Sequence, residues 1–179
     1  CDYFIGFKTG GIWTLNISSG VERWEEIPIN CGVCTLMKDR YQDIIWIASD
    51  GKGVYAYSDD EYSISSTFSS DISKLLGRPV RCMQLEKGDL GIGYKGDGIV
   101  KIDDYTPLTD LRHAHFTHFT ASDSRLTDNR VFAFEPGDND ILWIGHHEGL
   151  NYYSYRTRTI ERLPFMCNGE PIRFVHDIS

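Results

Sequence analysis

The chain of 179 residues carries 18 Lys and Arg against 26 Asp and Glu, which gives a formal net charge of minus 8 at pH 7. This acidic surplus disfavours contact with a phosphate backbone and excludes nucleic acid as the main partner. The 17 Gly, 10 Tyr, 9 Phe and 4 Trp are typical of aromatic strands joined by tight turns, which indicates an all-β protein. No apolar run approaches the about 18 residues that a membrane-spanning helix needs.

The first predicted element is a β-hairpin, FIGFKTGGIW from Phe4. A short apolar run, a polar turn that ends in Gly and a second apolar run form the pattern of two paired strands. The pattern returns as WIASDGKGVY from Trp46, GIGYKGDGIV from Gly91 and WIGHHEGLNY from Trp143. The sequence therefore predicts a repeat protein built from four hairpins.

The last glycine of each hairpin turn sets the period of the repeat. Gly11, Gly53, Gly98 and Gly149 are separated by 42, 45 and 51 residues, which is the period of β-propeller blades. Because bulkier residues resist a positive φ, we interpret these glycines as a backbone requirement of the turn and not as a ligand site.

Further strands recur in phase with the hairpins. Short apolar runs, VCTLM from Val33, VRCMQL from Val80 and VFAF from Val131, precede the last three hairpins. The segments VERWEEIP from Val21 and TRTIERLP from Thr157 follow the first and last hairpins. Four strands per repeat and no long amphipathic helix predict an all-β fold, a β-propeller of four-stranded antiparallel blades, with about four blades in this chain.

The predicted blades form a single propeller segment over 1–179. The chain opens in the second strand of a blade, and IRFVHDIS from Ile172 resembles the first strand of a further blade. A closed four-bladed ring, two chains sharing an eight-bladed ring, and a piece of a larger propeller all remain open, and we favour the last. The predicted repeats cover approximately 1–30, 31–78, 79–129 and 130–167, and a further blade starts at 168–179.

The fourth hairpin and its lead, LTDNRVFAFEPGDNDIL from Leu126, closely resemble the two-component regulator propeller (Reg_prop) repeat. That family has a lead "L-S-x-N-x-V", an acidic turn, then "L-W-I-G-T-x-x-G-L" and a tyrosine-rich strand. His146 stands where the family usually has Thr, Ala48 where it has Gly, and Gly91 where it has Trp. The residues that match are Leu126, Asn129, Val131, Leu142, Trp143, Ile144, Gly145, Gly149 and Leu150.

This resemblance implies the periplasmic sensor region of a hybrid two-component histidine kinase that responds to an oligosaccharide or other small ligand. Kinase activity and membrane attachment would then belong to other parts of the full-length protein, and this chain would not be an enzyme. The alternatives are a structural segment that mediates homodimerisation, with the ligand bound elsewhere, and a propeller enzyme that acts on glycans.

Turns between second and third strands and the connections between blades open on one face of a propeller, so their polar residues are candidate ligand-binding groups. Their mixture of basic and acidic groups would suit sugar hydroxyls or uronic acids, although each residue alone is expected to be a solvated loop residue. We expect no catalytic residues among them. The candidates are Lys8, Lys52, Arg78, Lys95, Asp97, Arg130, His146, His147 and Glu148.

No metal site and no cofactor are predicted. Cys31 and Cys34 form a single CxxC, but a zinc site needs two more ligands at suitable spacing, so the five cysteines are expected to be structural. His113 and His115 would share one face of a strand and His118 the other. We expect a polar outer strand there.

Overall fold

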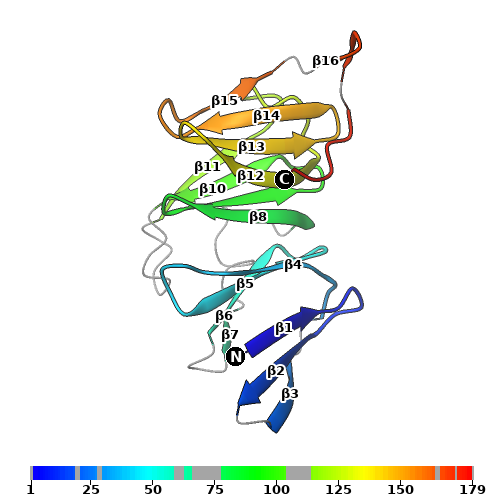
Figure 1. The fold of residues 1–179 in the computed structure, drawn as a ribbon, viewed down its shortest axis with the longest axis vertical. Helices are drawn as coiled ribbons and strands as arrows, with labels where there is room; N and C mark the ends of the chain where they lie inside the picture. The colour runs from blue at the N-terminus through cyan, green and yellow to red at the C-terminus, as the bar shows by residue number, and fades with distance from the viewer. Residues whose placement is uncertain are drawn as a thin grey trace. The chain divides into compact units, whose positions relative to one another are not determined.

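The computed structural model describes residues 2–18, 21–27, 30–58, 63–65, 78–103, 114–163, 166–171 and 173–178. The chain divides into two compact units, Cys1–Val80 and Arg81–Ser179. All regular elements described in them are β-strands (Figure 1). Within these residues, no helix has the length and apolarity to cross a membrane.

The first unit holds two antiparallel sheets. Blade 1 has the order β1-β2-β3, and blade 2 has the order β4-β5-β6-β7. The strands are β1 (Asp2–Gly6), β2 (Ile12–Ser18), β3 (Val21–Ile27), β4 (Val33–Lys38), β5 (Ile44–Ser49), β6 (Val54–Ser58) and β7 (Ser63–Ser65).

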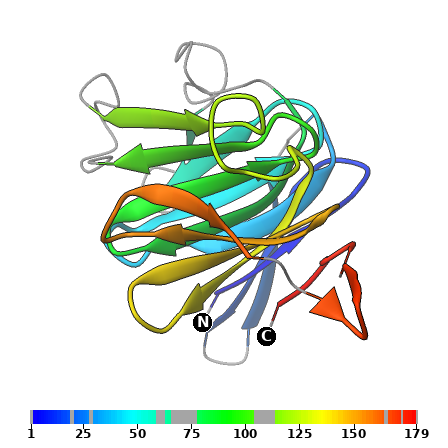
Figure 2. The ribbon, with the colours of Figure 1, turned by 90° about the horizontal axis from the view of Figure 1, so that it is seen from above.

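The second unit holds two four-stranded sheets and a short hairpin, β16–β17, that forms a sheet of its own. Blade 3 has the order β11-β10-β9-β8, and blade 4 has the order β12-β13-β14-β15. The first sheet comprises β8 (Val80–Glu86), β9 (Asp89–Tyr94), β10 (Ile99–Asp103) and β11 (His115–Phe119). The others are β12 (Val131–Gly137), β13 (Ile141–His146), β14 (Gly149–Ser154), β15 (Thr159–Arg162), β16 (Met166–Cys167) and β17 (Glu170–Pro171). Figure 2 shows the strands of this unit from above.

These sheets confirm the predicted all-β class and the four-stranded antiparallel blades. Strand β5 is buried at all six positions, as expected for a strand covered on both faces. The four turn glycines all adopt positive φ, at 84° for Gly11, 77° for Gly53, 78° for Gly98 and 124° for Gly149. Their recurrence is therefore a property of the turn, because other residues rarely adopt this backbone conformation.

A second glycine position explains how neighbouring elements pack within each unit. A Cβ at Gly6 would lie 2.4 Å from Val33 Cγ1, and a Cβ at Gly93 would lie 2.8 Å from Val131 Cγ1. The first valine of the next blade thus packs directly on the backbone of the preceding second strand. Gly145 has the same relation to Val175, whose Cγ1 would be 3.0 Å away.

Backbone hydrogen bonds show the same equivalence between Val33 and Val175. The Val33 N–H donates to the carbonyl of Phe7 at 2.9 Å, and the Val175 N–H donates to the carbonyl of His146 at 3.2 Å. Val175 therefore occupies the position that Val33 has at the start of β4. The start of a further blade near the end of the chain stays a prediction, because 173–178 is not itself a regular strand.

Each unit has its own apolar core. In the first unit Ile12 of blade 1 packs with Ile45, Ile47 and Tyr57 of blade 2. In the second unit Ile99 of blade 3 packs in one cluster with residues of blade 4 that include Ile144 and Tyr153. The apolar residues of the hairpins thus pack one blade on the next.

Candidate functional site

The predicted binding residues are distributed over both units. Lys8, Lys52 and Arg78 are exposed residues of the first unit. In the described part of that unit, no side-chain hydrogen bond or ion pair joins these three residues. Their role as ligand-binding residues stays a prediction.

Lys95 and Asp97 lie in the turn between β9 and β10 of the second unit and are half-buried. The carbonyl oxygen of Asp97 lies 2.6 Å from Nε2 of His118 in the neighbouring outer strand β11. This contact ties the turn to β11.

Three predicted residues come together at the hairpin turn of blade 4. His147 Nδ1 lies 3.0 Å from Glu148 Oε1, and Arg130 Nη2 lies 3.9 Å from the same oxygen. Asp128, in the connection before β12, joins them, with its Oδ2 at 4.0 Å from His147 Nδ1. We call this group, together with Arg173, the turn cluster.

Asp128 anchors the turn cluster to Arg130. Arg130 donates Nε–H to Asp128 Oδ1 at 2.9 Å and Nη2–H to Oδ2 at 2.6 Å. These charge-assisted hydrogen bonds lower the pKa of Asp128 below its ordinary value and raise that of Arg130. The guanidinium is thereby held in one orientation beside Glu148.

Aromatic rings border the turn cluster. His176 stacks on Phe132 at 4.3 Å between centroids with an interplanar angle of 13°, and the guanidinium of Arg81 lies over the same ring at 4.6 Å. Two planar groups at these distances must occupy opposite faces of Phe132. The ring of Phe174 meets His147 edge-on, with centroids 4.2 Å apart.

Phe174 is unusual in its backbone and its exposure. Its φ is 58°, a left-handed conformation that is costly for a bulky residue, by roughly 1–3 kcal/mol. Its N–H donates to the carbonyl of His147 at 2.9 Å, and 53% of its surface is exposed. The contacts with His147 thus hold a strained aromatic residue at the surface of the site.

His146 does not behave as the sequence predicts. It is fully buried at the end of β13, so it is neither a solvated turn residue nor able to contact a ligand directly. Its Nδ1 accepts a hydrogen bond from the Glu148 N–H at 3.2 Å. Ser49, at the equivalent position of blade 2, accepts in the same way from the Lys52 N–H at 3.1 Å. His146 therefore supports the turn instead of binding through it.

Because of His146, we expect the free energy of unfolding to fall as the pH drops below about 6.5, the ordinary pKa of histidine. Burial lowers the pKa of His146 in the folded protein, against the opposing charge of Asp128. Protonation of His146 is therefore less favourable in the folded than in the unfolded state. The stability present above pH 6.5 is lost as the pH falls from 6.5 toward the lowered pKa of folded His146. Thermal unfolding of wild type and His146→Thr between pH 7.5 and 5 should show a shallower slope in the variant.

Ser49→Thr is the control for this titration, because Ser49 fills the equivalent turn position of blade 2 and carries no titratable side chain, so the slope should stay unchanged. Asp128 affects stability in a separate pH range. Because its pKa is lowered in the folded protein, its contribution to stability is lost only below about pH 4. An unchanged slope in His146→Thr would show that another group causes the acid sensitivity.

One atom from each of Asp128, His147 and Glu148 lies within 4.8 Å of the others, a set that could hold a metal ion. However, Arg130 already donates to both oxygens of Asp128, so a cation would have to compete with a guanidinium. The geometry fits an ion-pair cluster better than a metal centre, and the absence of a metal stays a prediction.

The other histidines and cysteines that the sequence singles out are not members of the turn cluster. His115 and His118 are exposed on the outer strand β11, as predicted, whereas His113 lies outside the described residues. Cys31 is half-buried and Cys34 is exposed, and Cys31 Sγ lies 3.8 Å from the hydroxyl of Tyr55. Burial raises the pKa of the Cys82 thiol, which makes it unreactive.

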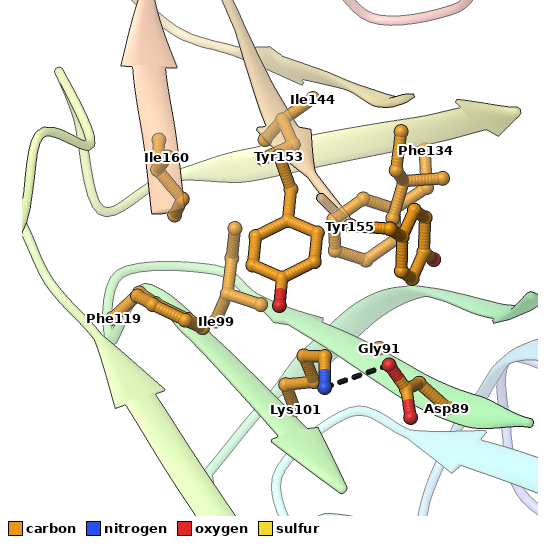
Figure 3. Close-up of a pocket in the computed structure, with 11 residues that line it drawn as sticks. Asp89, Gly91, Ile99, Lys101, Phe119, Phe134, Ile144, Tyr153, Tyr155 and Ile160 are labelled. Carbon is orange, nitrogen blue, oxygen red and sulfur yellow. Dashed lines mark ion pairs between the residues drawn. The ribbon is translucent and has the colours of Figure 1, made fainter. Parts of the chain in front are cut away.

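A pocket of about 20 Å³ lies between blades 3 and 4 of the second unit. Figure 3 shows Lys101 and Asp89 at one end of it and the rings of Tyr153 and Phe134 above them. The Lys101 ammonium is buried between Asp89, at 2.7 Å, and Asp103. This space suits a water molecule or a methyl group and not a sugar ring.

The pocket follows from a departure in the repeat. Gly91 stands where the other hairpins have Trp46 and Trp143, and it lines the pocket. A Cβ there would be in ordinary contact with the carbonyl of Gln84, at 3.7 Å, and with Phe134, at 3.8 Å. The missing indole therefore leaves a gap that the neighbouring aromatic rings only partly fill.

Sequence reasoning missed several residues of the site. Asp128 could have been found, because it lies two residues before Arg130 in the connection that was already a candidate. The sequence points to Arg173, Phe174 and His176 only as part of a first strand of a further blade, and their contact with the turn of blade 4 is seen only in the structure.

No protein-family model matches this chain, and no curated protein matches it either. Among solved structures it is similar to the extracellular domain of the B. thetaiotaomicron protein BT4673, named as a one-component or hybrid two-component system. In one structure of that domain the TM-score is 0.68, with 15% identity over 98% of this chain and 23% of that chain. The extracellular domain of BT3049, named as a hybrid two-component system of the same organism, gives 0.64, with 20% identity over 89% and 24%.

A β-propeller domain, that of Myceliophteria thermophila Cps50 (Swd1), is also similar, with a TM-score of 0.58 and 14% identity over 89% of this chain and 54% of that chain. The chain spans about a quarter of the length of the two bacterial domains. These likenesses confirm, at the level of fold, what the resemblance to two-component regulator propeller repeats predicts. The chain has the blade architecture of a β-propeller.

Proposed function

We propose that this chain is a ligand-sensing segment of the periplasmic region of a hybrid two-component histidine kinase, and that its ligand is an oligosaccharide. The observation that carries the proposal is the turn cluster with its exposed aromatic neighbour, Phe174. The fold shared with extracellular domains of such systems supports the class. The kinase and the membrane attachment would lie elsewhere in the full-length protein.

The chemistry of the site suits a sugar. Arg130, Arg173 and His147 supply hydrogen-bond donors, and Glu148 supplies acceptors, within one small area. The half-exposed ring of Phe174 offers an apolar surface beside them, and binding sites commonly combine such a surface with a few convergent polar groups.

The segment 173–178 gives the site a connection to the rest of the blade. Arg173, Phe174 and His176 contact the site, while Val175 packs on Gly145 in β13. A ligand that moves the first three residues would therefore also disturb the packing of Val175. This offers a physical route by which binding could be passed along the chain.

Isothermal titration calorimetry of the chain with a panel of neutral and acidic oligosaccharides tests the proposal. For a sugar that binds, we expect Phe174→Ala to weaken binding about three- to tenfold through loss of the aromatic surface. Tyr41→Ala is the matched control, because Tyr41 is equally exposed, at 58%, but lies in the first unit. If no sugar on the panel binds, the proposed function is wrong.

A second candidate function, self-association as a homodimer, is favoured by an apolar strip on blade 1. Tyr3 and Ile5 of β1 and Phe7, just after it, alternate along the chain and are each at least 41% exposed, and Trp13 is directly opposite Ile5 on β2. Alternate and directly paired residues share one face of a sheet. Light scattering should show a dimer that Ile5→Lys disrupts and Tyr41→Lys does not.

A further inference from the structure

Glu148 is the common partner of the positive groups in the turn cluster. Its Oε1 lies 3.0 Å from His147 Nδ1 and 3.9 Å from Arg130 Nη2, and its Oε2 lies 3.7 Å from Arg173 Nε. The three partners come from the connection before β12, from the hairpin turn and from the segment 173–178. They converge on a single carboxylate.

Two of these partners are also held without Glu148, and the third is anchored through its backbone. Arg130 keeps two hydrogen bonds to Asp128, and the ring of His147 lies between Phe132 and Phe174. Arg173 precedes Phe174, whose N–H is bonded to the carbonyl of His147. Removing the Glu148 carboxylate would therefore leave a preformed site for an anion.

The ion pairs of Glu148 are weak enough to exchange. The side chains of Glu148, Arg130 and Arg173 are 34%, 45% and 58% exposed, and ion pairs at such positions contribute little because water screens them. A ligand carboxylate that also places its sugar ring near Phe174 would gain a contact that Glu148 cannot make.

The charges of the turn cluster favour the same class of ligand once Glu148 is displaced. Arg130 and Arg173 face the carboxylates of Asp128 and Glu148, so displacing Glu148 leaves two guanidinium groups against one carboxylate. The vacated site is then locally positive in a chain whose net charge is minus 8. Such a local field attracts anions.

We propose that the Glu148 carboxylate is an internal substitute for the carboxylate of an acidic oligosaccharide, which displaces it to contact Arg130, His147 and Arg173. This inference rests on the proposed sensing function and narrows its ligand to sugars that carry uronic acids. Glu148 then acts as a built-in competitor that sets the affinity of the site.

The test is calorimetric titration of the 179-residue chain with trigalacturonic acid and with neutral galactotriose. Glu148→Gln should bind the acidic sugar about three- to tenfold more tightly, because the competing charge is gone, and Arg173→Gln should bind it more weakly by a similar factor. The matched control is Glu161→Gln, since Glu161 is similarly exposed, at 28%, and pairs with Arg125 away from the turn cluster. Its affinity should not change.

A second measurement does not depend on the stability of any variant. In the wild-type protein, the imidazole NMR signals of His147 should shift on addition of trigalacturonic acid, and this shift should weaken with rising salt as charge screening increases. An unchanged or weaker affinity in Glu148→Gln, or unmoved His147 signals when the acid binds, would overturn the inference. If galactotriose binds as tightly as trigalacturonic acid, only the preference for acidic sugars is wrong. If neither sugar binds, the proposed sensing function is wrong as well.

Discussion

Replacing Gly98 by Ala should destabilise the second unit by about 2–4 kcal/mol. Gly98 has a φ of 78°, which an L-residue adopts only at a cost. The added Cβ would also lie 2.2 Å from the carbonyl oxygen of Phe119, a backbone atom at the end of β11 that cannot rotate away. The N–H of Gly98 donates to the carbonyl of Asn129 at 3.0 Å, so the turn cannot shift without breaking this bond.

Gly96→Ala is the matched control for Gly98→Ala. Gly96 lies two residues earlier in the same turn, and a Cβ there would meet nothing within 4 Å. We expect its effect to stay within about 0.5 kcal/mol. Urea denaturation followed by circular dichroism measures the free energy of unfolding of both variants. If Gly98→Ala lost as little stability as Gly96→Ala, the turn would tolerate a side chain at either position.

Replacing Asp39 by Ala should destabilise the first unit by about 2–4 kcal/mol, because one buried carboxylate accepts several hydrogen bonds. Its Oδ1 accepts from the N–H groups of Tyr41, at 2.7 Å, and Gln42, at 3.1 Å. Its Oδ2 accepts from the indole N–H of Trp46 at 2.8 Å. Asp39 is only 3% exposed, so water cannot replace the lost acceptor.

Asp43→Ala separates the buried bonds of Asp39 from the effect of a lost charge. Asp43 pairs with Lys38 at the surface, where its side chain is 60% exposed, and such pairs contribute within about 1 kcal/mol. Thermal unfolding of the two variants should therefore differ clearly. If Asp43→Ala were as unstable as Asp39→Ala, net charge and not hydrogen bonding would explain the loss.

Most of the fold could be predicted because the repeat makes its requirements visible in the sequence. The positive φ of Gly11, Gly53, Gly98 and Gly149 admits few other residues, so the turns are marked by residue type alone. Strand β5, buried at every position, is marked by an apolar run from Ile44 to Ala48. Local backbone geometry and burial both restrict which residue types can occupy a position, so both can be inferred from the sequence.

The candidate site could be predicted only in part. Arg130, His147 and Glu148 are polar residues in turns that a propeller brings to one end, so their meeting follows from the architecture. His146 could not be placed in this way, because its neighbours His147 and Glu148 are partly exposed while it is buried. Its burial depends on a hydrogen bond within the turn that the sequence does not reveal.

The amino-acid sequence by itself determined the strands of the repeat, the turns that need glycine and the negative charge of the chain. Tertiary structure alone decided that Arg173 and Phe174 meet the hairpin turn of blade 4, and that Gly91 leaves a pocket beside Phe134 and Tyr153. Strands and turns depend on neighbours within a few residues. A binding surface depends on side chains far apart in the chain, whose distances are set only when the blades pack.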